Sequence, residues 1–565
     1  MPRIVYHLIA LLMITSGAWF VYGQTLHYSF HFDDYYFITE NLKIRDITQV
    51  RDIWHSLGKP SRFLGMYSFA LNYHFSQADV FGYHLVNILI HMVNGFLVYW
   101  LILLTLRTRP GWAEGRRMLA VSTALLFVCH PMNTQGVTYI SQRFASMATL
   151  FYLSALCFYI QGRLTAGNKG KLFFVFAFLS AVLGMFTKQI VLTLPVCILV
   201  YEYCFLDADK RIKIFRWPYL LILLGLFLIV PTLHSWDFSR LFDARIESRS
   251  HSGDILTSYT YMLTQFRVIP LYIRMMFFPI GQTLDYDFPV STQFWTWPVC
   301  SGMVFIFSVI AAAVMLLRRS PLIGFGVLWF FLTLGIESTI IPIYQVIFEH
   351  RCYLPGIGLL FAFNIFMWQS FKSRKKYLAG ITLIIIVFAW TAFKRNQVWE
   401  NETTLWKDIK QKAPRKMRPY IHLGVSYIMK GDYDLALNEF NEALQISRDD
   451  YKIYHNRGIA FEMKGDLEQA EKDYTRSIEL NPGSAVSYTN RGTVMVKLKR
   501  YNTALRDYNK AIELKPAYAD AYVGRGNLYY LAGRYEKALD DLVRAKELGS
   551  PIEESEIDKV KQLTR

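Results

Sequence analysis

Cysteine is scarce in this chain, and the placement of the few that occur argues against two kinds of site. Six cysteines are present among 565 residues, none of them lies in residues 415–565, and no pair is spaced as Cys-x-x-Cys. They are Cys129, Cys157, Cys197, Cys204, Cys300 and Cys352. This spacing indicates neither a zinc site nor a disulfide framework.

The C-terminal part lacks an excess of charge of either sign, although the whole chain carries a net charge of +17. Residues 415–565 hold 25 Lys and Arg against 23 Asp and Glu, so nearly all of the excess lies earlier. Much of it forms short basic clusters between apolar runs, such as Arg107 to Arg117 and Lys210 to Arg216. Such clusters are typical of the loops between membrane-spanning helices. They do not form a continuous basic surface that could bind the phosphate backbone of a nucleic acid. We therefore expect no nucleic-acid partner.

Residues 1–394 contain long uncharged runs, in a chain that is 53% hydrophobic overall. We predict about eleven membrane-spanning helices, near residues 4–23, 82–106, 118–137, 145–162, 172–187, 189–206, 217–236, 295–317, 321–336, 353–371 and 377–393. No convincing small-x-small cleavage site follows the first run, so we interpret it as an uncleaved helix and not as a signal peptide.

The basic clusters also predict the orientation of these helices. If the clusters are cytoplasmic, the N-terminus lies inside and the C-terminus outside. An amphipathic segment at about 258–280 would break this alternation as a single span, so we expect it to be interfacial or re-entrant.

Polar and ionisable residues that look out of place among the apolar runs all fall on the outer side in this topology. They include Asp33, Asp34, His130, Gln135, Gln142, Arg143, Lys188, Gln189, Arg267, Asp285, Asp287, Glu337, Glu349, His350 and Arg351. Such groups cost several kcal/mol at membrane depth unless they are paired or hydrated, so we expect them to converge on a polar cavity. For each residue the simpler alternative is a charge at a helix end among the headgroups.

The charged C-terminal part shows an internal repeat of 34 residues. Glycine and alanine recur in register, as Gly424, Gly458, Gly492 and Gly526 and as Ala436, Ala470, Ala504 and Ala538. Small residues at fixed positions let two helices cross closely, and this period is typical of tetratricopeptide repeats. The sequence thus predicts an all-α chain: a membrane helical bundle at 1–394, a linking helix or degenerate half-repeat at 395–416, a superhelix of four repeats at 417–550 and a capping helix at 551–565.

Arrays of this kind bind peptides or proteins in a concave groove. We predict a shared groove surface formed by Asn456, Arg457, Asn490, Arg491, Arg525 and Asn527. The aromatic, glycine and alanine positions of the repeat are instead interpreted as core.

The order of motifs in the first part resembles that of a known family. FDDYYFITEN follows the first span, and GYHLVNILIHMVN, CHPMNTQGVTYISQRFASMATLFYL, TKQIVLTLPVCILVYEY, LTQFRVIPLYIRMMFFPIGQTLDYDFP and FEHRCYLPGIGLL follow in turn. This resembles the transmembrane-and-tetratricopeptide O-mannosyltransferases, over nearly the whole chain and most closely their bacterial relatives. The repeats also stand where that family places them.

The resemblance implies a fold of the GT-C glycosyltransferase class and a polyprenyl-phosphate sugar as the donor. In that class an acidic residue of the first outer loop serves the reaction, and Asp33 and Asp34 match this motif. The motif here is Asp-Asp, whereas the better-known protein O-mannosyltransferases have Asp-Glu. The identity of the catalytic base therefore stays open between the two carboxylates. Inversion at the anomeric carbon is likewise implied by the resemblance alone.

The chemistry of such a transfer suggests roles for the remaining polar residues. A carboxylate can remove the proton of a Ser or Thr hydroxyl, with Asp33 as the first choice and Asp34 as the second. Cations and hydrogen-bond donors would neutralise the leaving phosphate, and the candidates are Arg143, Lys188, Arg267, Arg351, His130 and His350. Sugar or acceptor contacts are expected from Asp285, Asp287, Gln142, Gln189 and Glu349.

Other interpretations of the sequence stay open. The two aspartate pairs, Asp33 with Asp34 and Asp285 with Asp287, would supply oxygen ligands to a divalent metal, but nothing in their spacing demands one, and we predict no metal or other cofactor. The expected partners are the lipid bilayer, a polyprenyl-phosphate-linked sugar and an exported acceptor protein. The expected location is a bacterial inner membrane with the repeats outside the cytoplasm, or the endoplasmic reticulum of a eukaryote.

Two other functions are alternatives to sugar transfer. A non-enzymatic scaffold whose repeats assemble an envelope or pilus complex would not need ionisable groups buried on one side. A transporter of lipid-linked sugars would need charged groups on both membrane faces.

Overall fold

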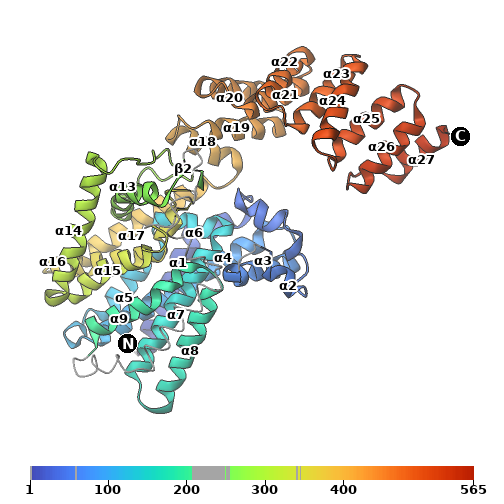
Figure 1. Ribbon diagram of the computed structural model, residues 1–565. Coiled ribbons are helices and arrows are strands. Elements are labelled where there is room, and N and C mark those ends of the chain that lie inside the picture. The colour runs from blue at the N-terminus through green and yellow to red at the C-terminus, as the bar shows by residue number, and fades with distance from the viewer. Residues whose placement is uncertain are drawn as a thin grey trace. The chain divides into compact units, whose positions relative to one another are not determined.

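The computed structural model describes residues 3–56, 60–206, 248–249, 255–338, 342–343 and 345–564. The chain divides into two compact units, Met1–Leu405 and Trp406–Arg565, which we call the first unit and the repeat unit. Apart from one pair of two-residue strands, the regular structure described is helical (Figure 1). The prediction of an all-α chain is confirmed.

The first unit consists of helices joined by short helical turns. Its α-helices are α1 (Arg3–Tyr22), α2 (Val50–Trp54), α3 (Phe63–Ser76), α4 (Val80–Arg107), α5 (Arg116–Val128), α6 (Thr134–Thr138), α7 (Arg143–Leu164), α8 (Gly167–Met185), α9 (Leu194–Phe205), α13 (Ser258–Phe277), α14 (Trp297–Arg319), α15 (Pro321–Leu334), α16 (Pro355–Ser370) and α17 (Arg374–Gln397). The short turns are η1 (Gly23–His27), η2 (Tyr35–Thr39), η3 (Leu42–Ile44), η4 (Pro60–Arg62), η5 (Pro110–Trp112), η6 (Pro131–Asn133), η7 (Ile140–Gln142), η8 (Gln189–Thr193) and η10 (Glu349–Cys352). The strands β1 (Ser248–Arg249) and β2 (Ile255–Leu256) pair antiparallel.

Within the described residues, six helices are long and apolar enough to cross a membrane. They are Ile4–His27, Val80–Arg107, Ile140–Leu164, Gly167–Met185, Trp297–Arg319 and Arg374–Gln397. Gln189–Phe205 and Pro321–Leu334 are shorter apolar helices, and α16 is also short. The predicted span at 217–236 and the basic cluster at 210–216 lie outside the described residues.

The predicted span at 118–137 is wrong as a single helix, because the chain breaks after Val128. Pro131 has no N–H to continue the ladder, and Asn133 donates a hydrogen bond from Nδ2 to the carbonyl oxygen of Phe127, at 2.7 Å. The His130 Nδ1 accepts the Met132 N–H at 3.1 Å and so caps the next turn. The residues after the break form the short elements η6, α6 and η7, and α6 contacts α4, α17 and η10.

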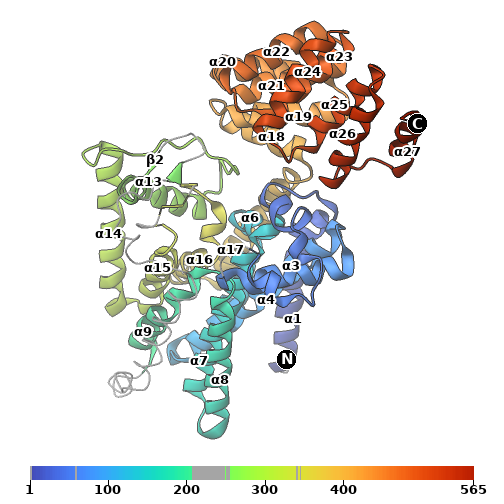
Figure 2. The same ribbon diagram turned by 45° about the vertical axis from the view of Figure 1, so that its right-hand side comes forward.

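Pairs of helices that follow one another in the sequence pack side by side in the first unit. α7 packs along α8 and α15 along α16 (Figures 1 and 2), and α4 packs against both α5 and α7. α13, predicted to be interfacial or re-entrant, is one helix of 20 residues with Pro270 inside it. It begins with a capping box formed by Thr257 and Thr260 and packs against α14.

The repeat unit is a series of antiparallel helix pairs. Its helices are α18 (Glu402–Lys412), which overlaps the division between the units, and α19 (Met417–Lys430), α20 (Tyr433–Ile446), α21 (Tyr451–Lys464), α22 (Leu467–Leu480), α23 (Ala485–Lys497), α24 (Tyr501–Leu514), α25 (Ala519–Leu531), α26 (Tyr535–Glu547) and α27 (Glu554–Leu563). A Cβ on Gly424 would lie 2.4 Å from the Phe440 ring, and one on Gly458 would lie 2.8 Å from the Tyr474 ring. These glycines therefore permit the close helix crossings that the periodicity predicts.

Candidate functional site

The residues after the first long helix fold into a small core of their own. Residues such as Phe30, Phe37 and Ile53 pack with Phe69 of α3 and Phe144 of α7, so this segment is a folded part of the first unit. Phe32 has a φ of +47°, a left-handed conformation that is rare for a bulky residue. Strained backbone of this kind persists only where its surroundings fix it, and it concentrates at functional sites. The strain at Phe32 turns the chain directly before Asp33.

Asp34 holds this turn in place. It is fully buried, and its two carboxylate oxygens accept the N–H groups of His31, at 3.0 Å, and Ser141, at 2.7 Å. Burial raises the pKa of Asp34 to about 7, although the hydrogen bonds from His31 and Ser141 lower it. Because both oxygens are occupied by backbone groups, Asp34 connects the first loop to the segment that leads into α7.

Asp33 has the opposite environment. Its N–H donates to the Tyr139 hydroxyl at 3.1 Å, and the Tyr139 ring stacks on Trp399. Its side chain is exposed, and its carboxylate has no hydrogen-bond partner among the residues that the structure describes. The backbone of Asp33 is thus fixed while its carboxylate stays accessible to a substrate.

Arg62, which the sequence analysis did not single out, lies close to Asp33. Burial lowers the pKa of Arg62, and the carboxylates of Glu337 and Asp33 raise it, which places both within range of charge interaction. The Leu64 N–H donates to the Phe186 carbonyl oxygen at 2.9 Å, so the start of α3 is tied to the turn before Lys188. Arg62 stands in the first outer loop of the expected topology, so the argument that selected the other polar residues could have included it.

Lys188 and Glu337 form a buried ion pair next to Arg62. The Lys188 Nζ lies 2.6 Å from Glu337 Oε1, and the two side chains are 7% and 3% exposed. Burial lowers the pKa of Lys188, the Glu337 carboxylate raises it, and Arg62 and Arg351 lower it further. Three cations therefore surround one buried carboxylate.

Two further residues near Lys188, His350 and Arg351, lie in η10. Burial lowers the pKa of His350 far below its ordinary value, and the charges of Lys188, Arg351 and Arg62 act in the same direction. His350 is therefore neutral at physiological pH, and its Nδ1 is buried without a hydrogen-bond partner among the described residues. Arg351 is buried and donates to the Tyr261 hydroxyl at 3.0 Å and to two backbone carbonyl oxygens. We call Arg62, Lys188, Glu337, His350 and Arg351 the cation cluster.

The geometry of Arg143 does not support the predicted phosphate-binding role. Its side chain is fully buried, with Nε donating to Asn87 Oδ1 and Nη1 donating to Asn72 Oδ1, both at 2.6 Å. The Nη1 also reaches Ser68, and Nη2 donates to the Tyr83 carbonyl oxygen. Each guanidinium nitrogen is used inside the protein, so Arg143 joins α3, α4 and α7.

His130 and Glu349 are likewise engaged within the fold. The His130 Nε2 bonds the Met276 carbonyl oxygen at 2.9 Å, and its Nδ1 caps η6, so neither ring nitrogen faces a ligand. Glu349 is buried and accepts hydrogen bonds from Tyr286, at 2.7 Å, and Gln282, at 3.1 Å. Gln142 and Gln189, in contrast, are half-buried.

Arg267 lies in α13 and is bonded to the loop that follows that helix. Burial lowers its pKa. Its Nη1 donates to the Pro289 carbonyl oxygen at 3.0 Å and to Ser291 Oγ at 2.9 Å. Asp285 is buried and Asp287 is exposed in the same loop. The structure therefore gives no support to the prediction that Arg267 shares a pocket with the aspartate pair.

The arginines predicted to line the repeat groove are paired with aspartates inside their own repeats. Arg457 binds both oxygens of Asp473, at 2.7 and 2.8 Å. Arg491 and Arg525 bind Asp507 and Asp541 in the same way, each 16 residues further on. Among the asparagines of the predicted surface, Asn456 and Asn490 are half-buried and Asn527 is exposed.

Taken together, the two units define a helical bundle of membrane-protein type followed by tetratricopeptide repeats. A family model described as "TPR repeat" matches residues 424–465 and 492–533, and one described as "Tetratricopeptide repeat" matches residues 451–484.

Curated homologues over most of the chain are protein O-mannosyl-transferases. One from Caenorhabditis elegans is 25% identical and covers 73% of this chain, and human TMTC4 and TMTC3 are 22% and 23% identical over 76% and 77%. The predicted resemblance to the transmembrane-and-tetratricopeptide O-mannosyltransferases is thereby confirmed, and its bacterial part stays a prediction. The matched regions cover 59%, 65% and 51% of these relatives, so the chain spans between about half and two thirds of their length.

Solved structures are similar over smaller parts of the chain. The crystal structure of MamA has a TM-score of 0.24 and 23% identity, and covers 28% of this chain and 89% of that one. The crystal structure of YrrB, titled as a TPR protein with an unusual peptide-binding site, has a TM-score of 0.25 and 20% identity, and covers 31% of this chain and 90% of that one.

Proposed function

We propose that the first unit is a membrane glycosyltransferase that moves a sugar from a polyprenyl-phosphate donor to Ser or Thr hydroxyls of exported proteins, and that the repeat unit binds the acceptor. One observation carries this proposal: an accessible carboxylate, Asp33, stands within charge range of Arg62, a member of a cation cluster that holds more positive than negative charge. The names of the homologues support the same reaction and favour mannose as the sugar.

The proposed mechanism assigns the two aspartates different tasks. Asp33 takes the proton of the acceptor hydroxyl as the bond between its oxygen and the anomeric carbon forms. Asp34 holds the turn that presents Asp33, through its bonds to the N–H groups of His31 and Ser141. Attack from the face opposite the phosphate inverts the anomeric carbon.

The cation cluster would receive the leaving group. The bond between the anomeric carbon and the phosphate oxygen breaks, and the phosphate departs with the electron pair. Arg62 and Lys188 are then placed to compensate the new negative charge, and the neutral His350 can donate or accept a hydrogen bond. In this proposal the base, Asp33, and the cations that would bind the leaving phosphate belong to the same site.

The repeat unit and the membrane complete the proposal. Acceptor binding by the repeats would raise the concentration of Ser and Thr side chains near Asp33. The polyprenyl donor places the reaction at a membrane surface, with the repeats outside the cytoplasm of a bacterium or in the lumen of the endoplasmic reticulum. No metal is required for these steps.

The decisive experiment compares Asp33→Asn with Glu40→Gln in the full-length protein. Glu40 is another exposed carboxylate of the same loop, so Glu40→Gln is the matched control. With polyprenyl-phosphate mannose and a Ser/Thr-rich acceptor protein, we expect Asp33→Asn to lower the rate by about 10²–10⁴-fold. The melting temperature should not change, because the Asp33 side chain bonds no described group.

Intact mass of exported proteins from cells provides the second readout. A hexose-sized mass that is present with the wild-type protein and with Glu40→Gln, and absent with Asp33→Asn, identifies both the sugar and the acceptor. Full modification in Asp33→Asn cells would overturn the role of Asp33. A scaffold, by contrast, would show no mass difference and would keep its assembly function in that variant.

A further inference from the structure

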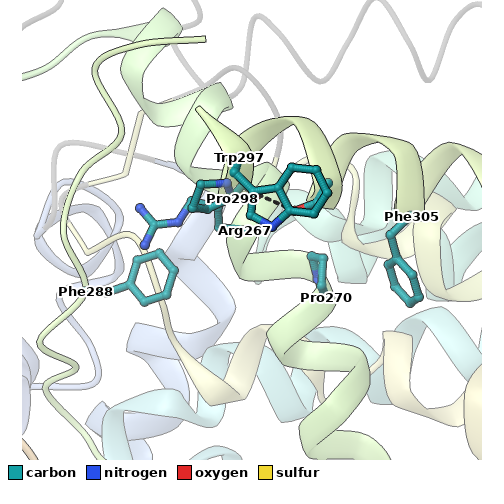
Figure 3. Close-up of a pocket in the computed structure, with 8 residues that line it drawn as sticks. Arg267, Pro270, Phe288, Trp297, Pro298 and Phe305 are labelled. Carbon is teal, nitrogen blue, oxygen red and sulfur yellow. Dashed lines mark hydrogen bonds between the residues drawn. The ribbon is translucent and has the colours of Figure 1, made fainter. Parts of the chain in front are cut away.

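An open groove lies between α13 and α14, and its lining includes neither Asp33 nor a residue of the cation cluster. Its volume is about 560 Å³, and its lining includes Pro270, Phe288, Trp297 and Phe305, with Arg267 at its edge (Figure 3). The two helices approach closely here, since a Cβ on Gly302 would lie 2.1 Å from the Phe266 carbonyl oxygen. Most of this lining is apolar, so the groove suits a hydrocarbon chain.

A second, smaller cavity of about 370 Å³ adjoins the groove and shares Arg267 and Pro298 with it. Its lining is polar and includes Ser291, Thr292, Gln293 and Thr296. An apolar groove and a polar pocket that meet at one arginine complement a molecule with a chain, an anionic group and a polar head. This is the pattern of an amphiphile and not that of a free sugar or a peptide.

Arg267 is prepared to bind an anion between the two cavities. Its guanidinium lies over the Phe288 ring, 4.6 Å from the ring centre, and its Nη1 is fixed by Pro289 and Ser291. Its Nε and Nη2 have no hydrogen-bond partner among the described residues, and no ion pair with a carboxylate occurs in the same set. A half-buried arginine without a counter-ion that keeps two N–H donors open matches the oxygens of a phosphate.

The surroundings place this site at the level of lipid headgroups. α14 is one of the helices long and apolar enough to span a membrane, and it begins at Trp297. Trp295 and Trp297 are 87% and 83% exposed. Tryptophans at the end of a spanning helix occupy the membrane–water interface, where an adjacent arginine meets the phosphates of lipids.

We propose that the groove between α13 and α14 binds an anionic phospholipid of the surrounding membrane, with its phosphate on Arg267, its head in the polar pocket and one acyl chain along Pro270 and Phe305. Neither Asp33 nor a residue of the cation cluster lines the groove or the polar pocket, so a phosphate held here would not be positioned for attack on its sugar. The site is therefore a lipid site separate from the proposed donor site.

The test is native mass spectrometry of the full-length protein with phosphatidylglycerol and phosphatidylcholine. Arg267→Gln removes the cation, Ser301→Phe fills the groove, and Arg274→Gln is the matched control, an exposed arginine of the same helix. We expect wild type and Arg274→Gln to prefer phosphatidylglycerol, and Arg267→Gln to bind it about fivefold more weakly. Ser301→Phe should retain less of either lipid, and melting curves will show whether it is folded.

Two outcomes overturn this proposal. One is equal binding of phosphatidylglycerol by Arg267→Gln and Arg274→Gln. The other is displacement of the bound phospholipid by an equimolar amount of polyprenyl phosphate, which would make the groove a donor site. Asp33→Asn, inactive under the proposed function, should keep the phospholipid, so the failure of one proposal is distinguishable from the failure of the other.

Discussion

The two units use arginine and lysine in contrasting ways. In the repeat unit each of three arginines binds both oxygens of one aspartate 16 residues away, so these charges are balanced in pairs. In the first unit Arg62, Lys188 and Arg351 surround one buried carboxylate, so positive charge is in excess. Balanced pairs stabilise a fold, whereas a buried excess of one sign requires a counter-ion from outside. The comparison favours the first unit as the location of the proposed reaction, whereas the three repeat arginines are bonded within their own repeats.

The largest effect is expected from Lys188→Met. This change leaves Glu337 buried without its closest counter-ion and should lower the free energy of unfolding by about 3–5 kcal/mol. Thermal unfolding of the purified protein measures the change. The double variant Lys188→Met/Glu337→Leu should regain most of the loss, and a double variant no more stable than the single one would contradict this account of the pair.

Arg143→Lys should have the next largest effect. Lysine cannot reach Asn87, Asn72 and Tyr83 at once, so buried acceptors lose their donors and the free energy of unfolding should fall by about 2–3 kcal/mol. The melting temperature and the KM for the donor are the measurements. An unchanged melting temperature with a raised KM would restore Arg143 to the phosphate site.

In the repeat unit, Arg491→Leu should lower the free energy of unfolding by about 1 kcal/mol. The variant removes a largely buried ion pair, in which the side chains of Arg491 and Asp507 are 17% and 6% exposed. Asp507→Leu should cost a similar amount, and the double variant less than the sum of the two. Hydrogen exchange of α23 and α24 in the full chain reports these changes. Weaker acceptor binding with unchanged exchange would show instead that Arg491 faces the ligand.

The smallest effect is expected at Lys499. Gly431, Gly465 and Gly533 have positive φ at the end of the first helix of their repeats, and Lys499 occupies the same position with a φ of +59°. Lys499→Gly should relieve this strain and raise the local stability by at most ~1 kcal/mol. Slower exchange at the end of α23 would confirm it, and faster exchange would contradict it.

The repeat array could be predicted in detail because its contacts are local. Gly424 and Phe440 are 16 residues apart and meet because each repeat folds on itself, so a period in the sequence is a period in space. The end of α5 at Val128 was not predicted, because the apolar run in the sequence continues past this residue. The partners that stabilise the break at Pro131 include Met276, which is distant in the sequence.

From the sequence, the candidate site could be predicted only as a set of polar and ionisable residues on one side of the membrane. Lys188, His350 and Arg351 were expected near the aspartates, and the cation cluster brings them together with Arg62, whose charge interacts with Asp33. Arg62 was missed, and the grouping of Arg267 with the aspartates stays a prediction, because alternation of helices predicts the side of a residue and not its neighbours. Asp33 and Asp34 are adjacent in the sequence, and only their contacts separate an accessible carboxylate from a buried one.

The sequence by itself determined the helical composition, the period of 34 residues and the separation into an apolar and a charged part, since these depend on local periodicity and on transfer of side chains from water. The tertiary structure alone decided which charges are paired. Pairing depends on distances of a few ångströms between segments that are more than a hundred residues apart, such as Lys188 and Glu337, and no pattern along the chain encodes such distances.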